Sequence, residues 1–248
     1  MKKIFLILAA IIGFATTANA THVLGGEISW RCLANGQYIF SMALYIDCAG
    51  LQWTFVNETI DIQGVPLPRS ASGSVVNSIT IRPNLTRLQN SNNGDTSPSC
   101  IPYENDPLSC ADEDQGTVQA FYYNSSPITL TGTPPGAGWK FFWQSLCCRP
   151  NDLENVNATG EMLLRAVMYP GPNGLRADPC FDSSPFFKSL PTTLICRGYE
   201  FTFNHTAIDD DLDSIVYSWD RPYNPPQSNP VALTYRIGFS PTNPTPDR

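Results

Sequence analysis

The amino-acid sequence predicts an all-β protein with an immunoglobulin-like β-sandwich. Three observations lead to this prediction. Apolar and polar side chains alternate in several short runs, clusters of turn residues separate those runs, and 22 prolines in 248 residues disfavour long helices. Short strands spaced in this way are typical of two packed sheets.

The first element is a secretory signal peptide, residues 1–20. Lys2 and Lys3 precede the apolar run IFLILAAIIGFA, and the small residues Ala18 and Ala20 fit a signal-peptidase site. The apolar run is shorter than the roughly 20 residues that span a bilayer. We therefore expect cleavage after Ala20 and a secreted or cell-surface product, with no membrane insertion of the mature chain.

The mature chain opens with a predicted hairpin. Two alternating runs, 27–32 and 37–47, flank Asn35-Gly36, a pair that favours a two-residue turn. Such a turn places Leu33 opposite Tyr38, so Cys32 and Cys48 fall on opposite sides of the ladder. We therefore expect no bond between these two cysteines.

Further alternating runs predict strands at 74–81, 117–123, 138–148 and 161–170. A change of composition at 169–193 marks a domain boundary. We expect a disulfide-rich sandwich at 21–183 and an incomplete second β domain at 184–248, because a complete sandwich takes about 100 residues.

Within the second unit, runs 199–206 and 214–219 read as strands, and an acidic connection joins them. Asp209, Asp211 and Asp213 stand at alternate positions there and could hold calcium, which takes several oxygen ligands. Ser214 stands where an EF-hand loop has glycine, so this is no EF-hand. A solvated turn without metal is the equally open alternative.

The net charge of −7 becomes −9 when the signal peptide removes two lysines, which leaves Lys140 and Lys188. Nucleic acids and anionic lipids bind clustered cations, so an acidic, lysine-poor chain is not expected to bind nucleic acid. The expected partners are an extracellular glycan or another surface protein.

Eight cysteines follow the signal peptide, and an even number in a secreted chain predicts disulfides. Neighbouring Cys147 and Cys148 point to opposite faces of an extended segment, so we expect them to have different partners. Cys100 and Cys110 could close their own loop. The remaining pairing is open among Cys32, Cys48, Cys100, Cys110, Cys147, Cys148, Cys180 and Cys196.

Two tryptophans near turns, Trp53 and Trp139, are candidates for stacking on sugar rings, whereas Trp143 and Trp219 lie in patterned runs typical of a core. The sequence offers few candidate catalytic residues for an enzyme, because its two histidines are His22 and His205. A glycosidase pair of acids would come from Asp209–Asp213 or from Asp112, Glu113 and Asp114.

Three stretches resemble large secreted surface proteins of the Bacteroidetes, described as gliding-motility-associated or type IX-secreted. They are THVLGGEISWRCLANGQYIFSMALYIDCAG, FFWQSLCCRP and CFDSSPFFKSLPTTLICRGYEFTFNHTAIDDDLDSIVYSWDRP. The resemblance implies an N-terminal β region, then cadherin-like or PKD-like repeats of immunoglobulin type, then a C-terminal sorting domain. Residues 184–248 would then begin the first such repeat.

The same resemblance makes Asp209, Asp211 and Asp213 look like the D-x-D-x-D element of cadherin-like repeats, in which aspartates often meet calcium. The sequence departs from that element at Leu212, where the family usually has glycine. If the position needs a positive φ, leucine costs about 1 kcal/mol or more there.

Taken together, the sequence predicts a non-enzymatic extracellular adhesin or structural protein of the cell surface. We expect it to be the N-terminal portion of a larger secreted protein, with gliding motility as one associated role and calcium as its cofactor. A carbohydrate-binding module is the first alternative, and a secreted glycosidase is the second.

Overall fold

The computed structural model describes residues 23–50, 53–90, 110, 117–150, 153–158, 160–171, 179–190 and 204–244. Within these ranges the chain forms β-strands and one short helix, α2 (Leu85–Asn90), whose first turn is capped where Asn84 Oδ1 accepts the Arg87 N–H. The all-β prediction is confirmed.

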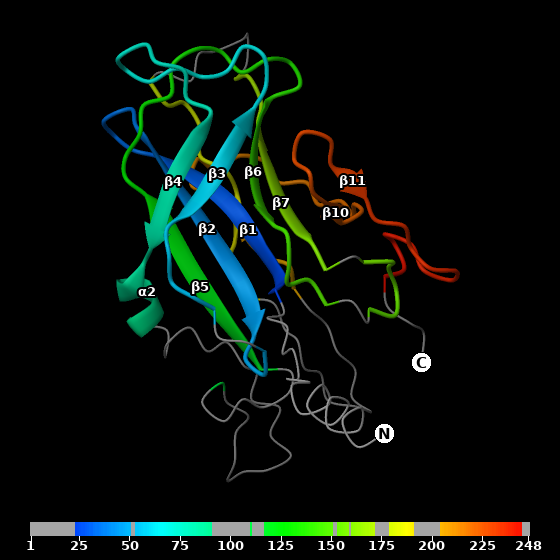
Figure 1. Ribbon diagram of the computed structural model, residues 1–248. Helices are drawn as coiled ribbons and strands as arrows, with labels where there is room; N and C mark the ends of the chain where they lie inside the picture. The colour runs from blue at the N-terminus through cyan, green and yellow to red at the C-terminus, as the bar shows by residue number, and fades with distance from the viewer. Residues whose placement is uncertain are drawn as a thin grey trace, which may run out of the picture.

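Nine of the described strands form one antiparallel sheet in the order β1-β2-β5-β4-β3-β6-β7-β10-β11 (Figure 1). A separate pair, β8 (Phe186–Phe187) and β9 (Ala207–Ile208), lies outside it. The strands of the large sheet are β1 (Val23–Cys32), β2 (Tyr38–Asp47), β3 (Glu58–Gln63), β4 (Ser78–Pro83), β5 (Val118–Ser125), β6 (Trp139–Ser145), β7 (Met162–Met168), β10 (Tyr223–Asn224) and β11 (Val231–Ala232).

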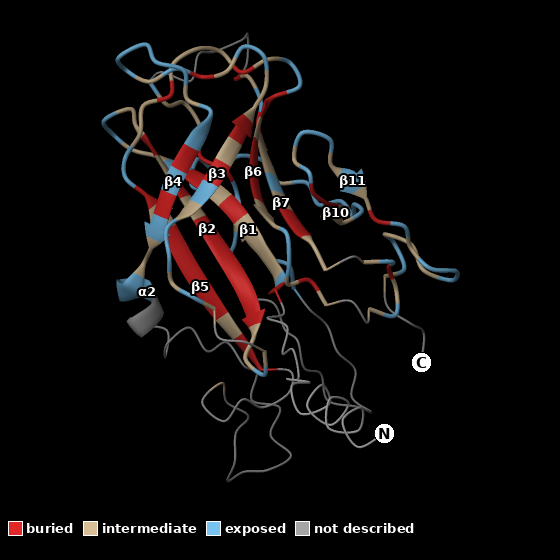
Figure 2. Cartoon of the chain, in the orientation of Figure 1, coloured by how far each residue is buried: buried red, intermediate tan, exposed pale blue. Residues whose placement is uncertain are grey.

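The two layers of the sandwich come from this one sheet, which curls until β1 approaches β7. The core lies inside the curl, where Phe40 of β2 meets Phe141 of β6 at 4.7 Å between ring centroids. Trp30 of β1 lies 5.6 Å from the same Phe141 ring. Burial is densest along β2 and β5, whereas Leu85 at the start of α2 and Val231 of β11 are exposed (Figure 2).

The first hairpin forms, but its turn differs from the predicted one. Leu33 N–H donates to the carbonyl of Gln37 and Gly36 N–H to that of Leu33, which makes a three-residue loop with Gly36 at φ 80°. Such loops end in a left-handed residue, and glycine adopts that conformation without a Cβ clash. Cys32 therefore pairs with Tyr38, one residue away from the predicted register.

The outer edge of β1 is closed by a segment from far along the chain, Cys180–Phe187, which we call the covering segment. Ser184 N–H donates to the Trp30 carbonyl at 2.9 Å, and its Oγ accepts the Trp30 N–H at 2.8 Å. Ser183 Oγ accepts the Cys32 N–H at 3.1 Å. These bonds satisfy strand-edge groups that would otherwise remain unpaired.

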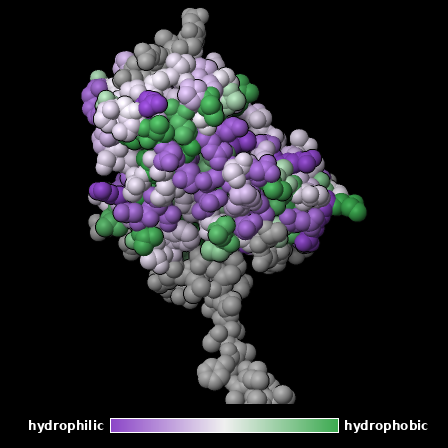
Figure 3. Space-filling view, turned by 45° about the horizontal axis from the view of Figure 1, so that its top comes forward, coloured by the Kyte–Doolittle hydropathy of each residue, from purple (hydrophilic) through white to green (hydrophobic). Residues whose placement is uncertain are grey.

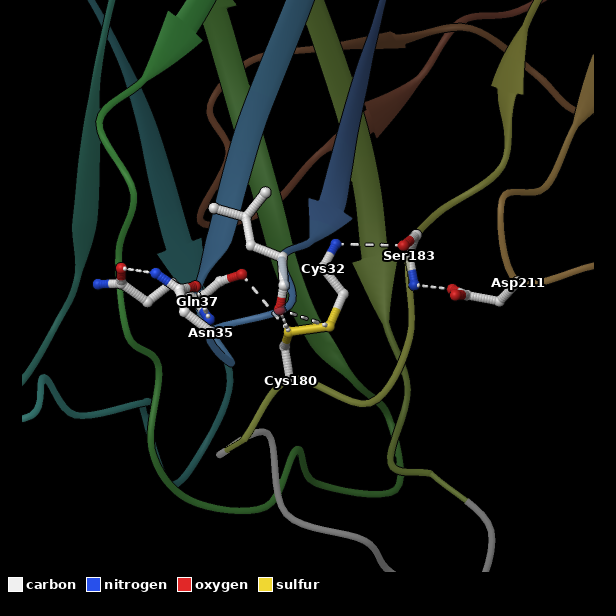
Figure 4. The surroundings of a disulfide bond; sticks show 7 residues. Cys32, Asn35, Gln37, Cys180, Ser183 and Asp211 are labelled. Atoms are coloured by element: carbon white, nitrogen blue, oxygen red, sulfur yellow. Dashed lines mark hydrogen bonds between the residues drawn. A yellow bond between two sulfur atoms is a disulfide. The ribbon is translucent and has the colours of Figure 1, made fainter.

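The disulfides of the described residues hold this arrangement together. Cys32 bonds to Cys180 across 148 positions of sequence, beside the contact of Ser183 with the end of β1 (Figure 4). The bonded pairs are Cys32–Cys180, Cys48–Cys110 and Cys147–Cys148, so Cys32 and Cys48 are not joined to each other.

Two expectations about cysteines are wrong. Cys110 does not close its own loop, because it bonds to Cys48 at the end of β2. Cys147 and Cys148 bond to each other, because the chain turns there, with Cys148 at φ 85°, instead of running extended. Cys100 and Cys196 lie outside the described residues.

The large sheet continues beyond position 184, where the sequence predicts a second domain. Tyr223 of β10 pairs with Leu163 of β7, and Val156 forms a bridge with Tyr235. Residues 223–235 therefore lie against the first sheet, and the start of a second domain at residue 184 stays a prediction. The predicted strand at 214–219 does not form, and β3, which the sequence analysis omitted, does.

The close approach of β1 and β7 gives a direct test of the curl. We expect Gly26→Ala to lower the free energy of unfolding by about 1–3 kcal/mol. A Cβ at Gly26 would lie 2.5 Å from the Ala43 carbonyl oxygen and 2.8 Å from Leu164 Cδ1. Gly25→Ala is the matched control, because a Cβ there meets nothing within 4 Å. Urea denaturation that finds both variants equally stable would contradict this packing.

Candidate functional site

The acidic turn, Asp209–Asp213, is placed beside the covering segment by the β8–β9 pair. Phe186 of the covering segment pairs with Ile208, so the chain enters the turn directly from that ladder. The strand before the turn is β9, which falls inside the predicted connection. Of the predicted strand 199–206, residues 199–203 lie outside the described chain and 204–206 are not strand.

The first aspartate of the turn folds it. Asp209 is 7% exposed, and its Oδ1 accepts the N–H groups of Asp211 at 2.9 Å and of Asp213 at 3.2 Å. An aspartate that accepts N–H groups two and four residues ahead fixes a tight turn in its own backbone. Asp209 therefore acts as a structural residue of the turn.

The third position of the turn joins it to the covering segment. Asp211 Oδ2 accepts the N–H of Ser183, while Ser183 Oγ accepts the Cys32 N–H on the other side (Figure 4). A chain of hydrogen bonds thus runs from the acidic turn through Ser183 to the end of β1. The charge on Asp211 strengthens the bond that it accepts.

A fourth carboxylate, which the sequence analysis did not single out, faces this turn. Burial, and after it the negative charges of Asp213, Asp209 and Asp211, raise the pKa of Asp182 to about 6. Asp182 stands next to Ser183 in the covering segment, so the segment that closes β1 also brings this carboxyl to the turn. Asp182 lies 27 positions before Asp209 in the sequence, and nothing in that spacing indicates that the two carboxyl groups come close to each other.

The side chains of the turn are not arranged as a calcium site. Among the described residues, no three histidine, cysteine, aspartate or glutamate side chains lie close enough to hold one metal ion. Asp209 and Asp211 each use a carboxylate oxygen on a backbone N–H group. Calcium at Asp209, Asp211 and Asp213 stays a prediction, and it requires these carboxylates to turn.

Of the two proposed sugar platforms, Trp139 cannot serve. Its side chain is fully buried, and its Nε1–H donates to the Pro66 carbonyl at 2.8 Å. Trp53 is half-buried, with its Nε1–H on the Tyr123 hydroxyl at 2.8 Å and its ring 6.3 Å from that of Trp143. It packs against the core, and its position near a turn was a poor guide.

The exposed tryptophan is instead Trp219, expected in the core and found 61% exposed. Its ring meets that of His205 edge-on at 5.8 Å, and His205 in turn lies 6.5 Å from Phe187. His205 sits in an aromatic cluster at the surface. Hydrophobic side chains also form small separate groups among hydrophilic ones on the face seen in Figure 3.

A groove of about 280 Å³ lies on the outer face of β1, β2 and β5. Four charged side chains line it, Glu27, Arg31, Arg87 and Asp210, and two of them have partners within the protein. The Arg87 guanidinium lies 3.8 Å above the Tyr122 ring, and Glu27 accepts the Tyr45 hydroxyl and the Phe187 N–H. Burial raises the pKa of Glu27. These pairings engage Glu27 and Arg87 within the protein.

The remaining candidate acids for a glycosidase, Asp112, Glu113 and Asp114, lie outside the described residues, as does His22. Within the described ranges, no helix is long and apolar enough to cross a membrane. The disulfides indicate folding in an oxidising, extracellular environment. No family model, curated protein or solved structure matches the chain.

The backbone of the turn explains why glycine would suit position 212. Leu212 is 91% exposed and adopts φ 63°, the left-handed region that disfavours side chains. We expect Leu212→Gly to raise the free energy of unfolding by about 0.5–1 kcal/mol, after the added chain entropy of glycine is included. Leu146→Gly, at an exposed leucine outside the left-handed region, should not stabilise. Thermal melts in which Leu212→Gly is the less stable protein would contradict the turn geometry.

The raised pKa of Asp182 predicts a pH-dependent stability. The folded protein holds this proton more tightly than the unfolded chain does, so the favourable contribution is complete below about pH 4 and is lost as pH rises through about 6. Asp182→Asn should therefore melt above wild type at pH 7.5 and close to it at pH 4.

Asp210→Asn is the control, because it removes an exposed charge from the same turn. A melting difference between Asp182→Asn and wild type that is the same at both pH values would argue against the crowding of carboxylates at Asp182.

Proposed function

We propose that this chain is a non-enzymatic extracellular protein of the cell surface, with an adhesive or structural role. The observation that supports this most is the Cys32–Cys180 bond, which ties the first strand to a segment 148 positions away. A covalently tied β framework resists unfolding outside the cell, where chaperones do not act, and it holds its loops in fixed positions. The resemblance to Bacteroidetes surface proteins agrees with this role.

A non-enzymatic role also fits the way in which the described acids are used. Asp209 and Asp211 accept backbone N–H groups and hold the fold, so neither is left free for proton transfer. A glycosidase needs two carboxyls facing each other across a sugar, one of them accessible as an acid. The secreted glycosidase is therefore the least supported of the three functions.

A carbohydrate-binding role is the second candidate and is compatible with the first. One cavity beside the acidic turn favours it, because aromatic rings and the carboxylates of Asp182 and Asp213 line that cavity together. Calcium belongs to the proposal as a possible stabiliser of the turn, and a calcium-dependent melting temperature that Asp209→Asn abolishes would support it. Asparagine keeps the Oδ1 acceptor of the turn and removes only the charge.

The proposed location and role can be tested on the cells that make the protein. Protease added to intact cells should remove it while a cytoplasmic marker persists. Beads coated with the oxidised protein should attach to those cells or to their extracellular matrix, whereas beads carrying reduced and alkylated protein should not.

Survival of the protein in protease-treated intact cells would contradict the surface location. Release of reducing sugar ends from a polysaccharide by the purified protein would contradict the non-enzymatic role.

A further inference from the structure

A cavity of about 540 Å³ lies where three distant parts of the chain meet. The end of β7 contributes Tyr169, the covering segment contributes Phe181 and Asp182, and the acidic turn contributes Asp213. Trp30 of β1 also lines it. The volume falls in the range of about 300–1,000 Å³ that is usual for small-ligand sites.

Trp30, which lines this cavity, has an unused hydrogen-bond donor. Its side chain is 94% buried, since the residue is 6% exposed, and its Nε1–H has no hydrogen-bond partner in the protein. The other tryptophans in the curl, Trp139 and Trp143, donate their Nε1–H to Pro66 and Glu58. A buried donor without an acceptor costs free energy, and a ligand oxygen that reaches the indole N–H would remove that cost.

The charges around the cavity limit what that acceptor can be. Asp182 and Asp213 line it, and its described lining residues include no lysine or arginine. An anionic ligand would be repelled by the carboxylates, and a metal cation cannot accept the indole N–H. A hydroxyl group meets both demands, because its oxygen accepts from the indole while its hydrogen donates to a carboxylate.

The rest of the lining supplies flat apolar surface. Tyr169 is 62% exposed, and Phe181 and Pro185 also border the cavity. Rings of this kind pack against the C–H face of a sugar, while its hydroxyls reach polar groups at the edge. The carboxylates here have no cation among the described lining residues, which distinguishes this cavity from the groove beside Glu27, where Arg31 and Arg87 form part of the lining.

We propose that this cavity binds a neutral saccharide, with Trp30 Nε1–H donating to one hydroxyl and the carboxylates of Asp182 and Asp213 accepting from others. Tyr169 stacks on the ring. This inference rests on the proposed extracellular role and supplies the ligand class for it. It also gives a function to the crowding of carboxylates, since ligand hydroxyls solvate charges that otherwise destabilise the fold.

The test uses the intact oxidised protein and named probes at pH 7.5. Lactose, cellobiose, maltose and N,N′-diacetylchitobiose, each up to millimolar concentration, are titrated while tryptophan fluorescence and heat are recorded. At least one of the four should bind. A sialylated form of lactose should bind more weakly than lactose itself, because it carries a negative charge into an acidic cavity.

Three variants examine the site itself. Trp30→Phe keeps an aromatic ring and removes the N–H, so affinity should fall by a few-fold to about tenfold. Asp182→Asn should weaken binding by about tenfold or more, because a charged acceptor is lost, although the same variant stabilises the fold at this pH. Tyr169→Ala should weaken binding without moving the melt.

Matched controls come from nearby side chains that do not line the cavity. Asp210→Asn removes a charge from the same turn, and Trp219→Ala removes an exposed aromatic ring, so both should bind as wild type does. If Trp30→Phe fails to fold, Asp182→Asn and Tyr169→Ala decide the question.

The proposal is overturned if none of the probes binds, or if binding survives Asp182→Asn and Tyr169→Ala unchanged. It is also overturned if sialylation leaves the affinity for lactose unaltered. Each of these results would leave the protease and bead experiments on surface location and cell attachment unaffected. A protein that is not found at the cell surface would overturn the extracellular role and not the sugar site.

Discussion

The structure depends on how the open edge of β1 is closed. An edge strand presents backbone groups that must find partners, and here the partners come from Ser183 and Ser184, about 150 positions later in the chain. The Cys32–Cys180 bond keeps that covering segment at the end of the strand. Because β1 also approaches β7, the same closure holds the curl of the sheet and the aromatic core inside it.

The acidic turn follows from this closure and shares its residues with the proposed site. Asp211 holds Ser183 in place, and the covering segment brings Asp182 against the turn at a cost that its raised pKa reveals. A fold selected for stability alone would replace such a carboxyl. Its presence in a cavity that Trp30 also lines fits a surface kept for binding, where stability is commonly lower than it could be.

Local patterns in the sequence predicted most of the large strands, because period-two alternation records which face of a sheet is buried. The sequence also indicated that leucine at position 212 would be unfavourable if the turn needed a positive φ there, and it does. The rest depends on loop geometry and on contacts between distant residues. The register of the first hairpin was missed by one residue because Asn35-Gly36 fits more than one loop length. Trp139 was expected at the surface and is buried, whereas Trp219 was expected in the core and is exposed. The position of a residue near a turn does not determine which side chains pack over it. Asp182 and Trp30 meet only through the covering segment, and no spacing in the sequence records that meeting.

Amide hydrogen exchange at Trp30 and Cys32 tests the central claim most directly. In the closed edge their N–H groups donate to Ser184 and Ser183, so both should exchange slowly in the native protein. In a variant with Cys32→Ser and Cys180→Ser, both should exchange faster while amides inside the β2–β5 ladder stay protected. Rapid exchange at both sites in the native protein would show an open edge and would contradict the account.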